Sequence, residues 1–134
     1  MNNYNYVNYD WYRKSNIDKI NNLYNPKEGF EKGNMFPNIY SEYKNYKPLK
    51  PKINNEREKL LYDISTICFA THELNLYLDL NPNDMTIIQL YNDYKNKESQ
   101  LVEEYERKFG PLTTSSIMKE PFSWEEDKWP WEVE

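Results

Sequence analysis

Few residues of this chain have types and spacings that could support chemistry, and the most suggestive ones surround His72. The stretch "THELN" begins like the zinc motif in which two histidines lie four positions apart on a helix, but Leu76 stands where the second histidine is needed. A di-metal carboxylate site requires Glu-x-x-His pairs, and Phe69 occupies the position three before His72. His72 is the only histidine in the chain. We therefore expect a structural imidazole, capable at most of a modest pH response, and no metal site.

The other reactive side chains also favour structural roles. Cys68 is the only cysteine, so no internal disulfide can form, and we expect a small apolar residue buried on a helix. Glu103, Glu104 and Glu106 follow the pattern of a solvated helix face. The chain has three glycines and no phosphate-binding loop, nucleophile elbow or CxxC pair. The sequence thus predicts a protein that is not an enzyme and that binds no cofactor.

Length, hydrophobic content and charge limit the remaining classes of protein. A chain of 134 residues with 38% hydrophobic residues forms one domain with a small core, so partners can supply part of its burial. It has no apolar run long enough for a membrane span and no signal peptide at its start, which predicts a soluble protein that is not secreted by the general route. The first 53 residues are basic, with nine Lys and Arg against five Asp and Glu, and the rest is acidic. The acidic part would repel phosphate, which argues against nucleic acid as a partner.

The strongest structural pattern is a helical hairpin over residues 54–110. Asn55 and Glu58 have the spacing of a capping box at the start of a first helix. The apolar residues of this helix alternate in steps of four and three, which is the spacing of a packing seam: Leu60, Ile64, Ile67, Thr71, Leu74 and Leu78. The "NPND" stretch ends this helix and starts the next, with Asn81 as the expected N-cap and Pro82 at the first helical position.

The second helix continues the same spacing until Gly110 and Pro111 stop it. Its seam residues are Ile87, Tyr91, Tyr94, Leu101 and Tyr105, and they are flanked by Leu90, Val102 and Phe109. A short connection makes the two helices antiparallel, and each is about 37 Å long. This register places Glu98 roughly level with Ser65 and Thr66.

The first helix carries a second line of apolar residues on the side that faces away from the seam. This line consists of Tyr62, Phe69, Leu76 and Leu80. One partner helix cannot cover both lines, and a soluble monomer rarely leaves such a strip exposed. We therefore expect the N-terminal arm, the C-terminal tail or another protein to pack against it.

The residues before the hairpin form an aromatic arm in two parts. Residues 1–24 are rich in Tyr and Asn and hold too little aliphatic content for a core, with at most a short helix over residues 15–24. Residues 25–53 begin with a helical turn, in which Asn25 is a cap, the next proline takes the first helical position and Gly33 supplies a left-handed stop. The prolines that follow predict an extended segment that lies on another surface.

The tail, residues 111–134, is acidic and carries four large rings: Phe122, Trp124, Trp129 and Trp131. Pro130 keeps the step between the last two extended, so both indoles project from a stiff strand. They either cover the chain's own hairpin or anchor on a partner, because Trp is often an interface anchor. The predicted fold is all-α: an antiparallel two-helix hairpin with an extended, largely irregular aromatic N-terminal arm and a Trp-rich C-terminal tail.

Two stretches resemble known families. From "LLYDISTICFATHELNLYLDLNPND" through "KFGPLT" and the terminal "KWPWEVE", the chain resembles the CotJB spore-coat peptide assembly family over residues 55–134, although Phe109 stands where a tyrosine is expected. The upstream "NPKEGFEKGNMFPNIYSEY", within residues 25–48, is similar to the small CotJA spore-coat family in its proline, helical turn, glycine and Phe-Pro step. A chain bearing both would be a fusion of two proteins that the resemblance implies work together.

The resemblance implies a structural or assembly component of the bacterial spore coat, made in the mother-cell cytoplasm. It also implies a partner similar to manganese catalases, a ferritin-like bundle that would supply the metal chemistry absent here, in a hetero-oligomer that can include several copies of this chain. The arm would dock either on the second line of the hairpin or on this partner. The expected docking residues are Met35, Phe36, Ile39, Tyr40, Tyr43, Tyr46, Tyr62, Phe69, Leu76, Leu80, Phe122, Trp124, Trp129 and Trp131.

Two alternative functions stay open. Thirteen tyrosines, eight of them before residue 50, could serve oxidative cross-linking in a self-polymerising coat protein. The chain could also be a small regulatory subunit, such as a lid over the substrate entrance of the catalase-like enzyme.

Overall fold

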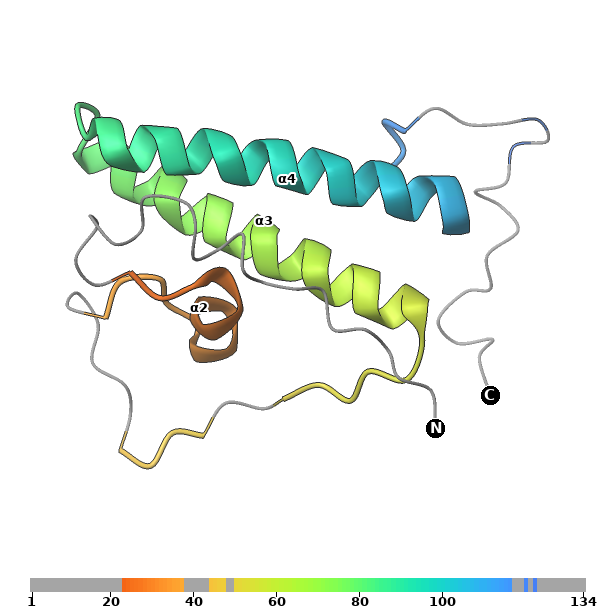
Figure 1. The fold of residues 1–134 in the computed structure, drawn as a ribbon, viewed down its shortest axis with the longest axis horizontal. Helices are drawn as coiled ribbons and strands as arrows, with labels where there is room; N and C mark the ends of the chain where they lie inside the picture. The colour runs from red at the N-terminus through yellow and green to blue at the C-terminus, as the bar shows by residue number, and fades with distance from the viewer. Residues whose placement is uncertain (1–22, 38–43, 48–49, 117–119, 121, 123–134) are drawn as a thin grey trace.

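The computed structural model describes residues 23–37, 44–47, 50–116, 120 and 122. Among these residues the chain forms three helices, α2 (Pro26–Lys32), α3 (Glu56–Leu80) and α4 (Met85–Phe109), and no strand. α3 and α4 run antiparallel as a long hairpin, and α2 packs on the side of α3 that faces away from α4 (Figure 1). The predicted all-α hairpin is confirmed. The short helix expected over residues 15–24 lies outside the described residues, except for its last two positions.

The two-turn helix α2 begins and ends where its sequence predicts. The Asn25 side chain accepts a hydrogen bond from the Glu28 amide at 2.9 Å, and Pro26 occupies the first helical position. Gly33 ends the helix with a φ of 74°, a left-handed conformation that favours glycine. This sharp stop returns the chain to α3, so that Met35 reaches the core of the protein.

α3 begins with a capping arrangement around Glu58. The Asn55 side chain accepts a hydrogen bond from the Glu58 amide at 2.8 Å, and the Glu58 carboxylate accepts one from the Asn54 amide at 2.7 Å. In the predicted capping box the amide of Asn55 itself would donate to Glu58, but here the donor is the amide of Asn54, the residue before the cap. This backbone hydrogen bond from Asn54 lowers the pKa of Glu58, so the carboxylate stays charged at the positive end of the helix.

The connection between α3 and α4 differs from the prediction, because Asn81 and Asp84 divide the capping between them. Asn81 ends α3, where its amide and its side chain both donate to the Tyr77 carbonyl, at 3.0 and 3.1 Å. Asp84 is the N-cap of α4 and accepts from the Ile87 amide at 3.1 Å. Pro82 consequently lies in the turn and not at the first position of the second helix. The expected stop at Gly110 is confirmed.

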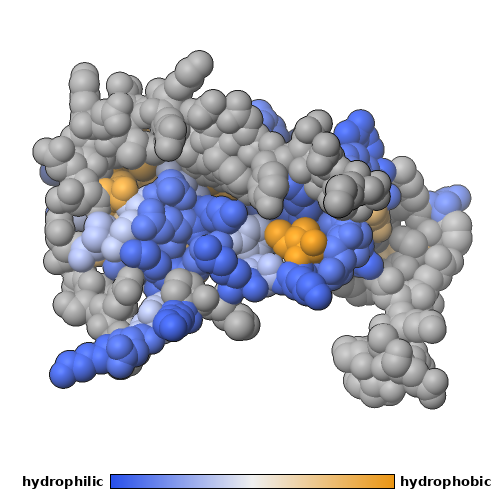
Figure 2. Space-filling view, turned by 60° about the horizontal axis from the view of Figure 1, so that its bottom comes forward, coloured by the Kyte–Doolittle hydropathy of each residue, from blue (hydrophilic) through white to orange (hydrophobic). Residues whose placement is uncertain are grey.

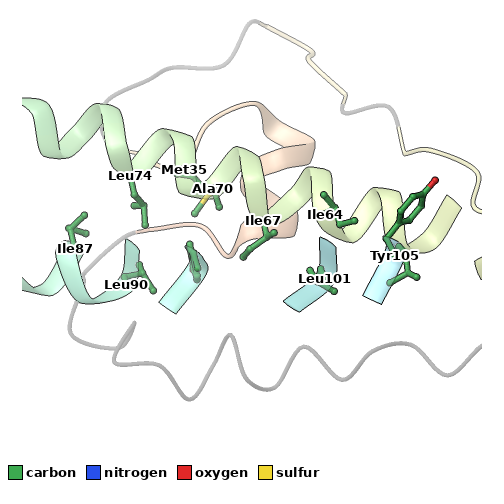
Figure 3. Packing of buried hydrophobic residues seen from close by; sticks show 11 residues of the cluster. Met35, Ile64, Ile67, Ala70, Leu74, Ile87, Leu90, Leu101 and Tyr105 are labelled. Carbon is green, nitrogen blue, oxygen red and sulfur yellow. The ribbon is translucent and has the colours of Figure 1, made fainter. Parts of the chain in front are cut away.

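The core follows the seam between α3 and α4 (Figure 3). The seam predicted on α3 is confirmed, and Leu78 is partly buried at its edge. On α4, Leu90, which was expected beside the seam, is in the core, and Tyr91, which was expected in the seam, is only partly buried. Glu98 lies near Cys68, less than one turn from Thr66, which is close to the level predicted for it. The buried apolar residues are Met35, Leu60, Ile64, Ile67, Ala70, Leu74, Ile87, Leu90, Tyr94, Leu101 and Tyr105.

Polar contacts fix the hairpin register at its open end. Arg57 Nε donates to the Tyr105 hydroxyl at 2.9 Å. Lys108 Nζ lies 2.6 Å from a carboxylate oxygen of Glu56 and 2.7 Å from one of Glu104, so it links the start of α3 to the end of α4. A slide of one helix along the other would break these bonds. No helix in the described part of the chain is both long enough and apolar enough to cross a lipid bilayer.

Candidate protein-docking site

α3 presents apolar side chains on two sides, and each side is covered differently. α4 covers the seam. On the second side, which carries the predicted line of Tyr62, Phe69, Leu76 and Leu80, α2 contacts the first two of these residues. The last two, toward the hairpin turn, are exposed. The second line is therefore half covered within the chain itself.

Phe30 of α2 accounts for most of the covered half. Its ring packs edge-on against Tyr62 and against Phe69, with centroids 5.6 and 5.8 Å apart. The Tyr62 hydroxyl donates to the Glu31 carboxylate at 2.9 Å, and burial followed by this contact raises the pKa of Tyr62. The sequence predicts that the N-terminal arm, the C-terminal tail or another protein packs on the second line. The arm packs on this part of it. Phe30 itself was not among the predicted contact residues.

Met35 anchors the same arm in the core. Its side chain is completely buried beside Ala70 of α3 (Figure 3). Its amide donates to the Glu73 carboxylate at 3.4 Å, and its carbonyl accepts from the Tyr24 amide at 3.1 Å. Gly29 permits this approach, because a Cβ at that position would overlap the Met35 sulfur. Met35, expected as a docking residue, thus docks on this chain's own hairpin and offers no surface to a partner.

Phe36 carries the arm toward the hairpin turn. Its ring stacks on Tyr77 with centroids 4.9 Å apart, and the Tyr77 hydroxyl donates to Asp84 at 3.2 Å. Burial raises the pKa of Tyr77, and the hydrogen bond to Asp84 adds to the shift. Asn34 holds Phe36 in place with hydrogen bonds to its amide and its carbonyl, both 2.9 Å. Tyr77 was not among the docking residues predicted from the sequence, because it lies between the two apolar lines of α3. Its ring contact with Phe36 joins residues far apart in the chain, which local spacing does not reveal.

The end of the hairpin near its turn carries three exposed apolar side chains. Leu76 and Leu80 lie one turn apart on α3 with 49% and 85% of their surface exposed, and Met85, at the start of α4, is 65% exposed. We call these three residues the tip patch. On the face that Figure 2 shows, the coloured surface is mostly hydrophilic and its hydrophobic areas are small. Single exposed leucines are common, but three large apolar side chains around one turn are a candidate contact surface.

The remaining expected docking residues are placed less tightly or not described. Tyr46 is exposed and its hydroxyl donates to the Glu31 carbonyl at 3.3 Å, while Phe122 is exposed in the tail. Outside the described residues lie Ile39, Tyr40, Tyr43, Trp124, Trp129 and Trp131.

The side chains that could carry chemistry are dispersed. His72 is exposed on α3. Cys68 is half-buried, and burial, followed by the nearby Glu98 carboxylate, raises the pKa of its thiol to about 11. Among the described residues no three His, Cys, Asp or Glu side chains lie close enough together to hold a metal ion.

The described residues form a small helical hairpin with exposed apolar side chains at its tip. The family model of the CotJB protein matches residues 58–132, more than half of the chain, and the chain belongs to the CotJB family. Membership associates it with spore-coat assembly, and the family has no known catalytic role. No curated protein and no solved structure matches the chain. The resemblance of residues 25–48 to CotJA stays a prediction, since the matched residues do not include them.

Proposed function

We propose that this protein is an assembly component of the bacterial spore coat and that it docks a manganese-catalase-like coat protein on the tip patch and the Trp-bearing tail. Membership of the CotJB family supports the coat role. The observation that carries the docking surface is the exposure of Leu80, 85%, on a helix whose other apolar residues are mostly covered. The identity of the partner rests on the resemblance alone.

The N-terminal arm covers one part of the apolar surface of α3, and the tip patch leaves another part open to a partner. Because α2 and Phe36 cover Tyr62, Phe69 and Tyr77 within the chain, a partner finds its apolar contacts on α3 beyond them, at Leu76 and Leu80. Burying one such aliphatic side chain is worth about 1.5–3 kcal/mol. Three of them, together with the large rings of the tail, can offset the cost of association.

Co-expression with the catalase-like coat protein tests the tip patch. The paired substitutions Leu76→Ser and Leu80→Ser are expected to lower the amount of co-purified partner at least about tenfold, since the loss of two apolar contacts costs more than about 1.4 kcal/mol. Ile53→Ser is the matched control, because Ile53 is also exposed but lies before α3, at the other end of the hairpin. Far-UV circular dichroism verifies that each variant folds.

Retention of the partner by the folded double variant would remove the tip patch from the proposal. The tail is tested separately by Trp129→Ala with Trp131→Ala in the same co-purification. A normal yield of partner from both pairs of variants would contradict docking by either surface. The cross-linking and lid functions stay predictions, and peroxide turnover of the co-purified enzyme, with and without this chain, addresses the lid.

A further inference from the structure

The segment 23–36, which we call the α2 unit, packs on α3 as a compact element of the chain. It precedes the residues matched by the CotJB family, 58–132. Its contacts with α3 come from a short run of chain, through Phe30, Met35 and Phe36. The face that it covers belongs to α3, which lies almost entirely inside the matched region. The fold thus contains a compact binding element and a binding face that are joined by a connecting segment.

That connecting segment is long, and most of its described part is exposed. Residues 37–54 comprise eighteen positions, which extended can span about 60 Å, more than the length of α3, about 37 Å. Residues 44–47 and 50–54 are all exposed. Within residues 44–47, the hydrogen bond from the Tyr46 hydroxyl to the Glu31 carbonyl, at 3.3 Å, contacts the α2 unit. The reach of this segment is sufficient to place the α2 unit on a neighbouring molecule.

Asn45, in the middle of this connection, has an unfavourable backbone conformation. Its φ of 63° lies in the left-handed region, and among the described residues it is the one non-glycine with a positive φ. Asparagine tolerates this region better than most residues, but it still pays a conformational cost that an open connection would release. Relief of this cost in an exchanged pair, where Asn45 can leave the left-handed region, would favour exchange of the attached element between molecules.

We propose that the α2 unit exchanges between two copies of this chain, so that the unit of each copy occupies the α3 face of the other. The exchange recreates the same contacts of Phe30, Met35 and Phe36, and so needs no new complementary surface. The closed chain is the monomer, and the exchanged pair is a dimer with the same covered face twice. This self-association goes beyond the proposed function, because it involves neither the tip patch nor the catalase-like partner.

Disulfide trapping between different copies tests the exchange. One chain carries Phe30→Cys and a second carries Phe69→Cys, both in a full-length Cys68→Ser background, because these two rings are neighbours in the fold. The chains are mixed, unfolded, refolded together at several concentrations and oxidised. We expect a disulfide-linked heterodimer of twice the 16.4 kDa chain mass, whose fraction increases with concentration. The same chains carrying Leu76→Ser and Leu80→Ser should link equally well, which separates this result from failure of the proposed function.

A chain that carries both Phe30→Cys and Phe69→Cys is the control for geometry. If it links internally while the mixed chains never link to each other, the exchange is wrong. Light scattering of the unmodified protein gives an independent result. A dimer whose fraction falls severalfold with Asn45→Gly, which tolerates the left-handed turn, and rises with Asn45→Val, which does not, supports the proposal. A monomer mass at every concentration overturns it, whatever the cross-linking shows.

Discussion

The ring of Phe36 lies stacked on the ring of Tyr77, with planes 17° from parallel. The contact joins the N-terminal arm to the last turn of α3, and the Tyr77 hydroxyl continues to Asp84, the N-cap of α4. One side chain of α3 thereby connects the arm, the middle helix and the hairpin turn. Loss of the stacked ring should therefore loosen the arm and the turn together.

Phe36→Ala is expected to lower the free energy of unfolding by about 2 kcal/mol, because a partly buried aromatic ring and its stacking contact are lost. Urea unfolding followed by far-UV circular dichroism measures the change. Leu80→Ala serves as the control, since Leu80 is largely exposed and its substitution should change stability by no more than about 0.5 kcal/mol. Equal stabilities of the two variants would show that the ring pair does not hold the arm.

Gly29→Ala is expected to destabilise the protein even though alanine favours a helix over glycine by about 1 kcal/mol. The added Cβ would overlap the Met35 sulfur and lie 3.3 Å from the Asn34 carbonyl oxygen, and such overpacking costs about 1–3 kcal/mol. The net loss should be about 1 kcal/mol in urea unfolding. Combining it with Met35→Ala removes the overlap, so the two losses should be less than additive. A stabilised Gly29→Ala variant would mean that Met35 is not packed against this glycine.

The ion-pair group around Lys108 predicts a stability that depends on pH. The hydrogen bond from Lys108 lowers the pKa of Glu104 below its ordinary 4.5, and the hydrogen bonds to Glu104 and Glu56 raise the pKa of Lys108 above its ordinary 10.5. The lowered carboxyl pKa stabilises the fold above pH 4.5, and this contribution is lost as the pH falls through the folded value. The raised lysine pKa stabilises the fold below pH 10.5, and that contribution is lost as the pH rises through the folded value.

Lys108→Met should therefore lower the urea concentration at the unfolding midpoint most between pH 4.5 and pH 10.5. At a pH below the lowered pKa of Glu104 in the folded chain, the variant and the unmodified protein should unfold at nearly the same urea concentration. High salt at neutral pH should also reduce the difference in urea midpoint between the variant and the unmodified protein, because the side chains of Lys108, Glu56 and Glu104 are partly exposed and salt screens their charges. A difference of equal size in acid and at neutral pH would show that Lys108 acts through packing and not through charge.

The thiol of Cys68 should react slowly in the folded protein. Its pKa of about 11, against an ordinary 9.0, leaves about 100-fold less thiolate at neutral or mildly alkaline pH, and the thiolate is the reactive form. Iodoacetamide should therefore alkylate the folded chain about 100-fold more slowly than the chain in urea. Glu98→Gln should speed the reaction, because the carboxylate contributes to the raised pKa. Equal rates in the folded chain and in urea would contradict the burial of this side chain.

The sequence by itself determined the features that depend on near neighbours. The caps at Asn25 and Asn55, the left-handed stop at Gly33 and the seam spacing of α3 all follow from hydrogen bonds and contacts within one or two helical turns. These interactions act over three or four residues, so the order of side chains is sufficient to predict them. The CotJB resemblance was also evident from the residues, and the family match confirms it.

Only the tertiary structure decided how the two-sided helix α3 is covered. The sequence offered an arm, a tail and a partner for the second apolar line, and the fold places Phe30 on Tyr62 and Phe69 while leaving Leu80 exposed. These contacts join residues more than 30 positions apart, whose pairing depends on chain reach and on shape, and no local periodicity encodes it. The choice of Asp84 as N-cap has a similar cause, because Asn81 is already engaged in closing α3.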